Sequence, residues 1–456
     1  MRERSQVVPK RVIFVGTDHS DQLQLRESAH ITQPFDYITL SHCWGKPTDE
    51  EMERFRTTPR NYQKRLEGFS YQGLPKAFQD AITVTRELNK QYLWIDALCI
   101  IQGDQKDWEE EGARMDKVFA SAYCTIASSS ASGWHDGFLN RTQNFCQSEG
   151  VSSDQKIIDD FCKLVDEGQL HTRAWVLQER ALSRRTIYFT AQQTYWECGR
   201  GVRCENFTTL RCPTTRLYLL DSRFPERLVL AGYKTAALFL QELITDYSRR
   251  DLTFPKKDKV VAFSGIAERI KEALATEFRY GVFHCFLSRL LLWKRAGMES
   301  DQIFYDNDYV PSWSWMRYNG KIDFLTQSDL QVPRNESLSF DNSERGINIE
   351  VRQLEDCYTR ERDGEHIIFS KAKRVEVMKG VEVGILHFDM GSTAEVESRN
   401  CVVIAMSQDD DKDDPNKEYY ILAVQRTSGE EEYERLGVGR VRACYVSKGS
   451  TSGKLL

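Results

Sequence analysis

The sequence predicts an α/β fold, in which a parallel sheet with helices is followed by a helical region and a β-rich C-terminal region. Three observations lead to this fold class. Short apolar runs alternate with segments of helical periodicity in the first part, as in βαβ units. Apolar residues recur at helical spacing from Arg227 to Arg295, and short strand-like runs dominate from about Pro311 onward. The expected parts are residues 1–210, 211–300 and 301–456.

Local signals define the elements of the first part. Short apolar and β-branched runs predict strands at 11–16, 37–41, 92–96, 123–130, 186–190 and 194–198. Leu74-Pro75 opens a helix that ends near Asn89, because proline is favoured at a first helical position. The amphipathic run Asp107 to Ala122 and the segment Thr172 to Leu182 predict two more helices. This alternating order predicts parallel strands joined by right-handed crossovers.

The composition narrows the classes of function. An apolar fraction of 40% with 11% aromatic residues is enough to bury real cores, so disorder is not expected. A net charge of -6 gives no general attraction to nucleic acid. No apolar run reaches the roughly 18 residues of a membrane span, and MRERSQVVPKRVIFVG lacks the long apolar stretch of a signal peptide. We expect a cytoplasmic protein that binds neither nucleic acid nor membrane.

The cysteines and the common motifs point away from metal and cofactor chemistry. Twelve cysteines in the cytoplasm predict reduced thiols rather than disulfides. Cys198, Cys204 and Cys212 lie close in sequence, but no C-x-x-C pair occurs, so we expect no metal site. A G-x-G-x-x-G after a strand, a P-loop and H-E-x-x-H are all missing, which leaves dehydrogenase, NTPase and zinc-protease functions without support.

Polar and aromatic groups stand where three apolar strands end. The carboxyl ends of strands form the ligand crevice of open α/β sheets, so we expect these groups to line one site. They are Ser41, His42, Trp44, Gly45, Asp96 and Ser128. All but His42 also have a structural alternative: the serines as turn residues, Trp44-Gly45 as a strand terminator, and Asp96 as a cap of the next segment instead of a partner for a hydroxyl-rich ligand.

The helix from Thr172 adds Arg173, Trp175 and Glu179 to the candidates. Trp175 precedes Glu179 by one turn, so the two side chains share a helix face. Arg173 could face a pyrophosphate or pair with Glu179, and Trp175 could pack on a ligand ring or on the core. Glu179 could equally be a surface acid paired with Arg173 or Arg180.

His42-Cys43 also raises the possibility of thiol chemistry. Adjacent residues on a strand point to opposite faces, so these two cannot act as a dyad. Another histidine, such as His135 or His171, would have to partner Cys43.

Several motifs, taken in order, resemble the fungal heterokaryon incompatibility (HET) domain. They are SHCWG, LPKAFQDAITVTRELNKQYLWIDALCIIQGDQKDW, the M-x-x-V-F-x-x-A run from Met115 to Ala122, and RAWVLQE. The resemblance covers roughly residues 37–200, and YSRRDLTFPKKDKVVAFSGIA and PSWSW also look like full-length members. His42 stands where tyrosine is usual and Ala174 where glycine is usual, and His42 lies at the expected ligand edge.

The HET domain is in turn similar to TIR domains, flavodoxin-like modules of which some cleave NAD. The resemblance implies a flavodoxin/TIR-like fold for residues 1–210. It implies Glu179 as the catalytic residue, because Trp175 and Glu179 match the W-x-x-x-E arrangement. The substrate would be NAD, hydrolysed at the nicotinamide–ribose bond without a metal or cofactor, in a programmed cell death or allorecognition response.

The resemblance also implies a homo-oligomer on activation, and a protein partner for recognition. Two alternatives to an NAD hydrolase remain open. One is a non-enzymatic self-association and signalling module, in which Glu179 is structural. The other is a repurposed small-molecule-binding enzyme, in which His42 serves new chemistry.

Overall fold

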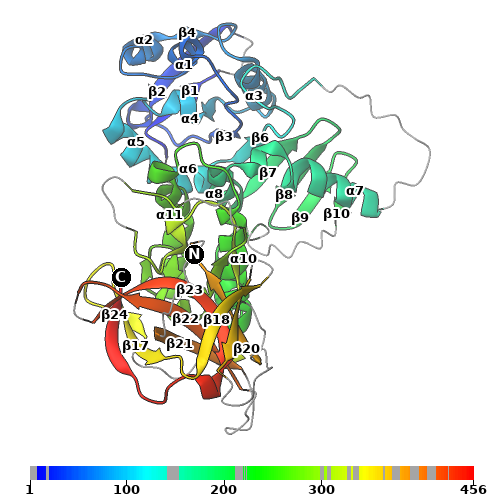
Figure 1. Cartoon of the computed structure of the whole chain (residues 1–456). Helices are drawn as coiled ribbons and strands as arrows, with labels where there is room; N and C mark the ends of the chain where they lie inside the picture. Colours follow the sequence, from blue (N-terminus) through cyan, green and yellow to red (C-terminus); the bar gives the residue numbers. More distant parts are fainter. Residues whose placement is uncertain are drawn as a thin grey trace. The chain divides into compact units, whose positions relative to one another are not determined.

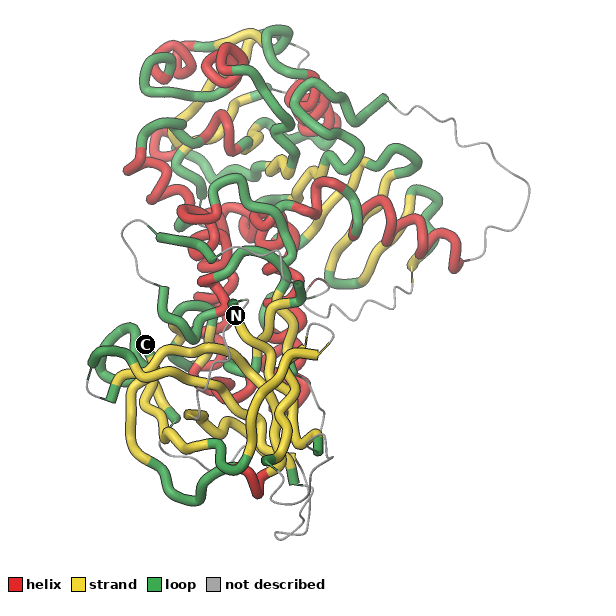
Figure 2. Tube along the Cα trace, in the orientation of Figure 1, coloured by secondary structure: helices red, strands yellow, loops and turns green. Residues whose placement is uncertain are grey.

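The computed structural model divides into two compact units. It describes residues 8–16, 20–140, 154–210, 219, 221, 223–297, 302–305, 310–325, 330–331, 338–362, 365–371, 381–390, 400–407, 417–429 and 431–456. The first unit comprises Met1–Leu230, Arg250–Thr253 and Val261–Ile270, and the second comprises Ala231–Arg249, Phe254–Val260 and Lys271–Leu456. Figures 1 and 2 show a sheet with helices in the first unit and mostly strands in the second.

Among the described residues, a ten-stranded mixed sheet forms the centre of the first unit. Its strands are β1 (Arg11–Phe14), β2 (Gln22–Glu27), β3 (Ile38–Ser41), β4 (Phe69–Ser70), β5 (Tyr92–Trp94), β6 (Cys124–Ala127), β7 (Arg185–Phe189), β8 (Thr194–Cys198), β9 (Gly201–Cys204) and β10 (Thr209–Leu210). Their order across the sheet is β10-β9-β8-β7-β6-β3-β5-β1-β2-β4. Strands β5, β3, β6 and β7 are parallel, and both flanks of the sheet are antiparallel.

The expected α/β class is therefore confirmed, but the expectation of a parallel sheet holds only for the four central strands. Two antiparallel pairs in the flanks, β1 with β2 and β7 with β8, join strands that follow each other through short connections. Residues 15–21 join β1 to β2, and residues 190–193 join β7 to β8, whereas a parallel crossover needs a dozen residues or more. Periodicity in the sequence signals a strand but not its direction.

The order in which the chain adds parallel strands to the sheet reverses between β3 and β6. The chain passes from β3 to β5 on one side and then returns to β6 on the other. Across the sheet the parallel strands are arranged β5-β3-β6-β7. Numbered by their order in the chain, this arrangement is 2-1-3-4. Open α/β sheets bind ligands outside the carboxyl ends of the strands at such a reversal.

Helices lie between these strands in the chain and pack on the sheet, and α9 follows the last of them (Figure 1). They are α1 (Asp49–Phe55), α2 (Tyr62–Glu67), α3 (Lys76–Glu87), α4 (Asp96–Cys99), α5 (Gln105–Gly112), α6 (Met115–Ser121), α7 (Asp154–Phe161), α8 (Ala174–Leu182) and α9 (Glu226–Leu230). Helix α3 follows Pro75, as predicted. The single helix expected from Asp107 to Ala122 is two helices, α5 and α6, and the first ends at Gly112, a residue type that disfavours helix.

The second unit contains helices and a barrel-like sheet. Its helices are α10 (Tyr233–Ser248), α12 (Leu287–Leu290) and both ends of α11 (Pro255–Leu274). Five strands pair in a closed ring: β17 (Ile347–Gln353), β21 (Asn400–Ser407), β22 (Glu418–Arg426), β23 (Glu432–Arg442) and β24 (Thr451–Leu455). The other strands are β11 (Phe278–Arg279), β12 (Val282–Phe283), β13 (Trp293–Arg295), β14 (Ile322–Phe324), β15 (Leu330–Gln331), β16 (Ser339–Phe340), β18 (Cys357–Arg362), β19 (Glu365–Ser370) and β20 (Glu382–Phe388).

A buried ion pair fastens this barrel-like sheet to β13. The Arg435 guanidinium contacts the Asp389 carboxylate at 2.7 Å and donates to the carbonyl of Leu291 at 2.7 Å. It also lies 3.5 Å from the centre of the Trp293 ring.

Helices and a β-rich C-terminal region are both present, as the sequence predicts. No helix in the described part of the chain is long and apolar enough to cross a membrane.

Candidate functional site

The ends of β3 and β6 meet at the reversal of strand order. Ser41 is the last residue of β3, and its carbonyl accepts hydrogen bonds from the backbone N–H and the hydroxyl of Ser128, at 3.0 and 3.3 Å. Ser128 is fully buried. Its hydroxyl therefore ties the two strand ends together.

The Ser41 side chain faces α8. Two residues earlier, the Thr39 hydroxyl lies 2.8 Å from that of Thr125, which lies 2.6 Å from the hydroxyl of Ser183 at the end of α8. Alternate residues of a strand share a face, so Ser41 points to the same helix. Ser183 also donates to the carbonyl of Glu179 at 2.6 Å, which places the predicted acid on that side of the sheet.

Glu179 is a buried acid, with an exposed fraction of only 7%. Burial raises its pKa to about 7, Asp96 adds to the rise, and Arg173, Ser41 and Arg250 oppose it. Neither Glu179 Oε2 nor Ser41 Oγ has a hydrogen-bond partner of normal geometry among the described residues. Such orphan polar atoms are costly in a protein interior and are filled by ligands or water in many sites.

The structural alternative for Glu179, a surface acid paired with an arginine, does not hold. Arg180 instead binds Glu197 through two hydrogen bonds of 3.0 and 2.9 Å, and Asp166 at 2.6 Å. Arg173 donates to the carbonyl of His42. The Glu179 carboxylate is thus left facing the strand ends.

A segment far away in the sequence holds the start of α8. Arg250 donates to the carbonyls of His171 and Arg173, at 2.7 and 3.4 Å. The backbone of Asp251 exchanges hydrogen bonds with Thr172 and Ala174 on either side of Arg173, at 2.6 and 3.0 Å. No local pattern in the sequence relates Arg250 to α8, so the sequence alone does not predict this contact.

Asp96, which follows the end of β5, also belongs to this cluster. One carboxylate oxygen accepts from the Trp44 indole N–H at 3.0 Å, and the other accepts from the backbone N–H of Ala97 at 2.7 Å. Asp96 thus has its own partners at the start of α4. About a quarter of its side chain is exposed, so it also lies at the open edge of the cluster.

His42 lies on the opposite face of the sheet from Ser41. Its ring meets that of Phe78 on α3 edge-on, with 5.2 Å between the centres, and only 2% of the residue is exposed. Burial lowers the pKa of His42 to about 4, although Asp96 at 3.8 Å acts in the other direction. The imidazole is therefore neutral at neutral pH, and its Nε2 has no partner among the described residues.

Cys43 belongs to an apolar cluster with Val176 and Tyr188. Burial raises the pKa of its thiol, and nearby Glu179 raises it further against the effect of Arg173. A nucleophilic cysteine needs a lowered pKa. The environment of Cys43 therefore favours the inert thiol.

Gly45 allows two backbones to come together beside the strand ends. It has a φ of +72°, and a Cβ at this position would lie 2.9 Å from the Cα of Gly133. The following Trp134 is buried, with its ring centre 5.4 Å from that of Trp44. Trp175 is half-buried and packs on the main core of the first unit.

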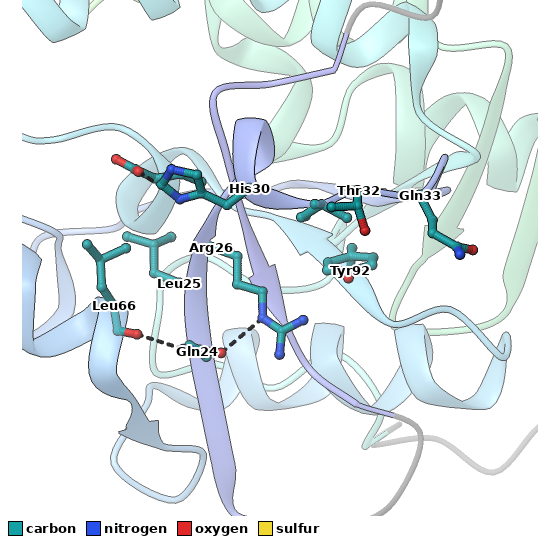
Figure 3. A pocket seen from close by; sticks show the side chains of 10 residues that line it. Gln24, Leu25, Arg26, His30, Thr32, Gln33, Leu66 and Tyr92 are labelled. Carbon is teal, nitrogen blue, oxygen red and sulfur yellow. Dashed lines mark hydrogen bonds and ion pairs between the residues drawn. The ribbon is translucent and has the colours of Figure 1, made fainter.

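The pocket in Figure 3 lies elsewhere in this unit, with a volume of about 560 Å³. It is lined by Tyr92, the first residue of β5, whereas Asp96 follows the opposite end of that strand. Within the described ranges, no group of three or more His, Cys, Asp or Glu residues is placed to hold a metal ion. Cys212 lies outside those ranges.

The fold and the cluster define an α/β domain with a buried carboxylate at a reversal of strand order. Residues 37–179 match the family described as heterokaryon incompatibility protein (HET). The chain therefore carries a HET domain, as its motifs predict, and the match runs from Tyr37, just before β3, to Glu179 itself. No curated protein and no solved structure matches the chain.

Proposed function

We propose that this HET domain acts in heterokaryon incompatibility by binding NAD at the strand-end cluster and hydrolysing its nicotinamide–ribose bond. The observation that carries the proposal is the buried Glu179 carboxylate, with an unpartnered oxygen, at the reversal of strand order. The order of the parallel strands is that of flavodoxin-like sheets, which supports a TIR-like relationship. A cell-death or allorecognition response would follow from NAD loss in the cytoplasm.

The chemistry needs a carboxylate but no metal. The bond between the ribose C1′ and the pyridinium nitrogen breaks, and its electron pair leaves with nicotinamide, which is neutral without taking up a proton. Positive charge develops on the ribose ring, and ionised Glu179 would stabilise it. Water then adds to C1′ and releases one proton, giving ADP-ribose.

Neighbouring groups suit the rest of the substrate. The unpartnered Ser41 hydroxyl would donate to a ribose oxygen, and the Arg173 guanidinium would face a phosphate. Because Glu179 is almost fully buried, the cluster has to open before NAD reaches it. We propose that self-association of the chain drives this opening.

The test is nicotinamide release by the purified full chain, with Glu179→Gln as the variant. Glu111→Gln is the matched control, because Glu111 on α5 is also a buried glutamate whose pKa is raised by burial. We expect Glu179→Gln to lose roughly 100-fold or more in rate, and the control to keep it. Absence of NAD turnover and binding in the wild type would favour the non-enzymatic self-association module.

A further inference from the structure

The pocket of Figure 3 is a concave site in the first unit, apart from the Glu179 cluster. It is formed by β2, the short helical turn Ser28–His30 and the residues after it, the end of α2, and the start of β5. Its volume of about 560 Å³ lies in the range of small-molecule sites.

One positive charge in this pocket is fixed in place but unpaired. Arg26 donates through Nε to the side chain of Gln24 at 2.9 Å, and Gln24 donates in turn to the carbonyl of Leu66 at 2.8 Å (Figure 3). The guanidinium also stacks 3.7 Å from the centre of the Phe14 ring. Its two terminal nitrogens have no hydrogen-bond or ion-pair partner in the described part of the chain. A planar fork held in this way matches the two oxygens of a carboxylate.

Glu27 brings a negative charge to the same pocket. The Glu27 carboxylate accepts a hydrogen bond from the Tyr62 hydroxyl and lies 3.2 Å from the His30 ring. A cationic ligand would compete with these donors, whereas an anion would bind at the open terminal nitrogens of Arg26, whose side chain leaves β2 on the opposite face from that of Glu27.

The remaining wall combines apolar and aromatic side chains with the polar residues Thr32 and Gln33. Leu25, Ile31, Leu66 and Tyr92 line it, and the Tyr92 ring lies 4.7 Å from that of Phe35, between ring centres. Thr32 beside them can donate a hydrogen bond. A ligand that fits both halves of the pocket has a ring at one end and a carboxylate at the other.

We propose that this pocket binds a small aromatic carboxylate, whose carboxylate contacts the terminal nitrogens of Arg26 and whose ring packs against Tyr92 and Ile31. The proposal does not depend on the function of the Glu179 cluster. It concerns the opposite end of β5.

The test uses benzoate, titrated into the full chain and followed by saturation-transfer NMR and calorimetry. Benzyl alcohol serves as the neutral ring and inorganic phosphate as the anion without a ring. We expect saturable binding of benzoate, weaker by tenfold or more for the other two probes. Equal binding of benzyl alcohol or of phosphate would overturn the proposal, as would the absence of saturable benzoate binding.

Two variants test whether benzoate binds in this pocket. Arg26→Gln is expected to weaken benzoate at least tenfold, and Arg60→Gln, at an exposed arginine on the same unit, is the matched control. Ile31→Asp leaves Arg26 intact but sets a like charge against the ligand, and is expected to abolish binding. Unchanged affinity in folded Arg26→Gln or Ile31→Asp would contradict the assignment.

Discussion

Ser41, at the end of β3, and the two residues that follow it have different environments, because side chains of an extended chain alternate between faces. Ser41 points to α8 and the Glu179 cluster, while His42 packs on Phe78 of α3. Cys43 is buried beside Val176. The unusual His42 therefore contributes to the core on one face, and the chemistry that we propose belongs to the other.

The burial of Glu179 predicts a specific pH dependence of stability. Its pKa of about 7 lies above the ordinary value of 4.5, so the folded state holds the proton more tightly than the unfolded state. The contribution of Glu179 to stability is then lost as pH rises from 4.5 to 7, and Glu179→Gln lacks this loss. We expect the variant to gain up to about 3 kcal/mol relative to the wild type over this range, as measured by urea unfolding.

An exposed glutamate provides the control for this effect. Glu109 on α5 is exposed, and Glu109→Gln is expected to change the free energy of unfolding little at any pH. A Glu179→Gln variant whose stability relative to the wild type does not vary with pH would show that the carboxyl group is not buried in solution.

At the scale of elements, the position of α8 depends on contacts made by buried arginines. Arg180 binds Glu197 on β8 and Asp166 before α8, and the Tyr188 hydroxyl also donates to Glu197. These contacts fix the helix that carries Glu179. Arg180 is in this sense a positioning residue.

Removing Arg180 should therefore be strongly destabilising. Arg180→Met leaves Glu197 and Asp166 buried without their cation, which typically costs about 3–5 kcal/mol. The measurement is chemical denaturation of the full chain. Adding Glu197→Gln should recover part of the loss, and a loss no larger than that of Arg60→Gln would contradict the network.

The sequence predicted individual residues of the site better than the long-range contacts that position them. Glu179, Ser41 and Asp96 were found because strand ends and a W-x-x-x-E helix are local patterns. Arg250 was not found, because its contacts with the start of α8 span a long stretch of chain. The face on which His42 lies, and the directions of the outer strands, also depend on the tertiary arrangement.

At the scale of the whole molecule, the first unit includes a piece of chain from beyond its main segment. Residues 261–270 of α11 belong to it, and Gly265 is in close contact with α6 and α8. A Cβ at Gly265 would lie 2.5 Å from the Cβ of Asp116 and 2.6 Å from the side-chain oxygen of Gln178.

Gly265→Ala is expected to destabilise the first unit by about 1–3 kcal/mol, because the clash outweighs the gain in helix propensity. Gly112→Ala is the matched control: this helical glycine has only Val261 nearby, at an ordinary 3.8 Å. Thermal unfolding of both variants would check the contact. If Gly265→Ala and Gly112→Ala unfold at the same temperature, residues 261–270 do not pack on this unit.

Catalysis by Glu179 is tested most directly by the pH dependence of nicotinamide release by the wild type and Glu179→Gln. An ionised Glu179 is required, so the wild-type rate should rise with pH around a midpoint near 7, where the carboxyl group loses its proton. The rise should vanish in the variant. Release that is equal in both proteins, or absent from the wild type across the range, would show that Glu179 does not catalyse NAD hydrolysis.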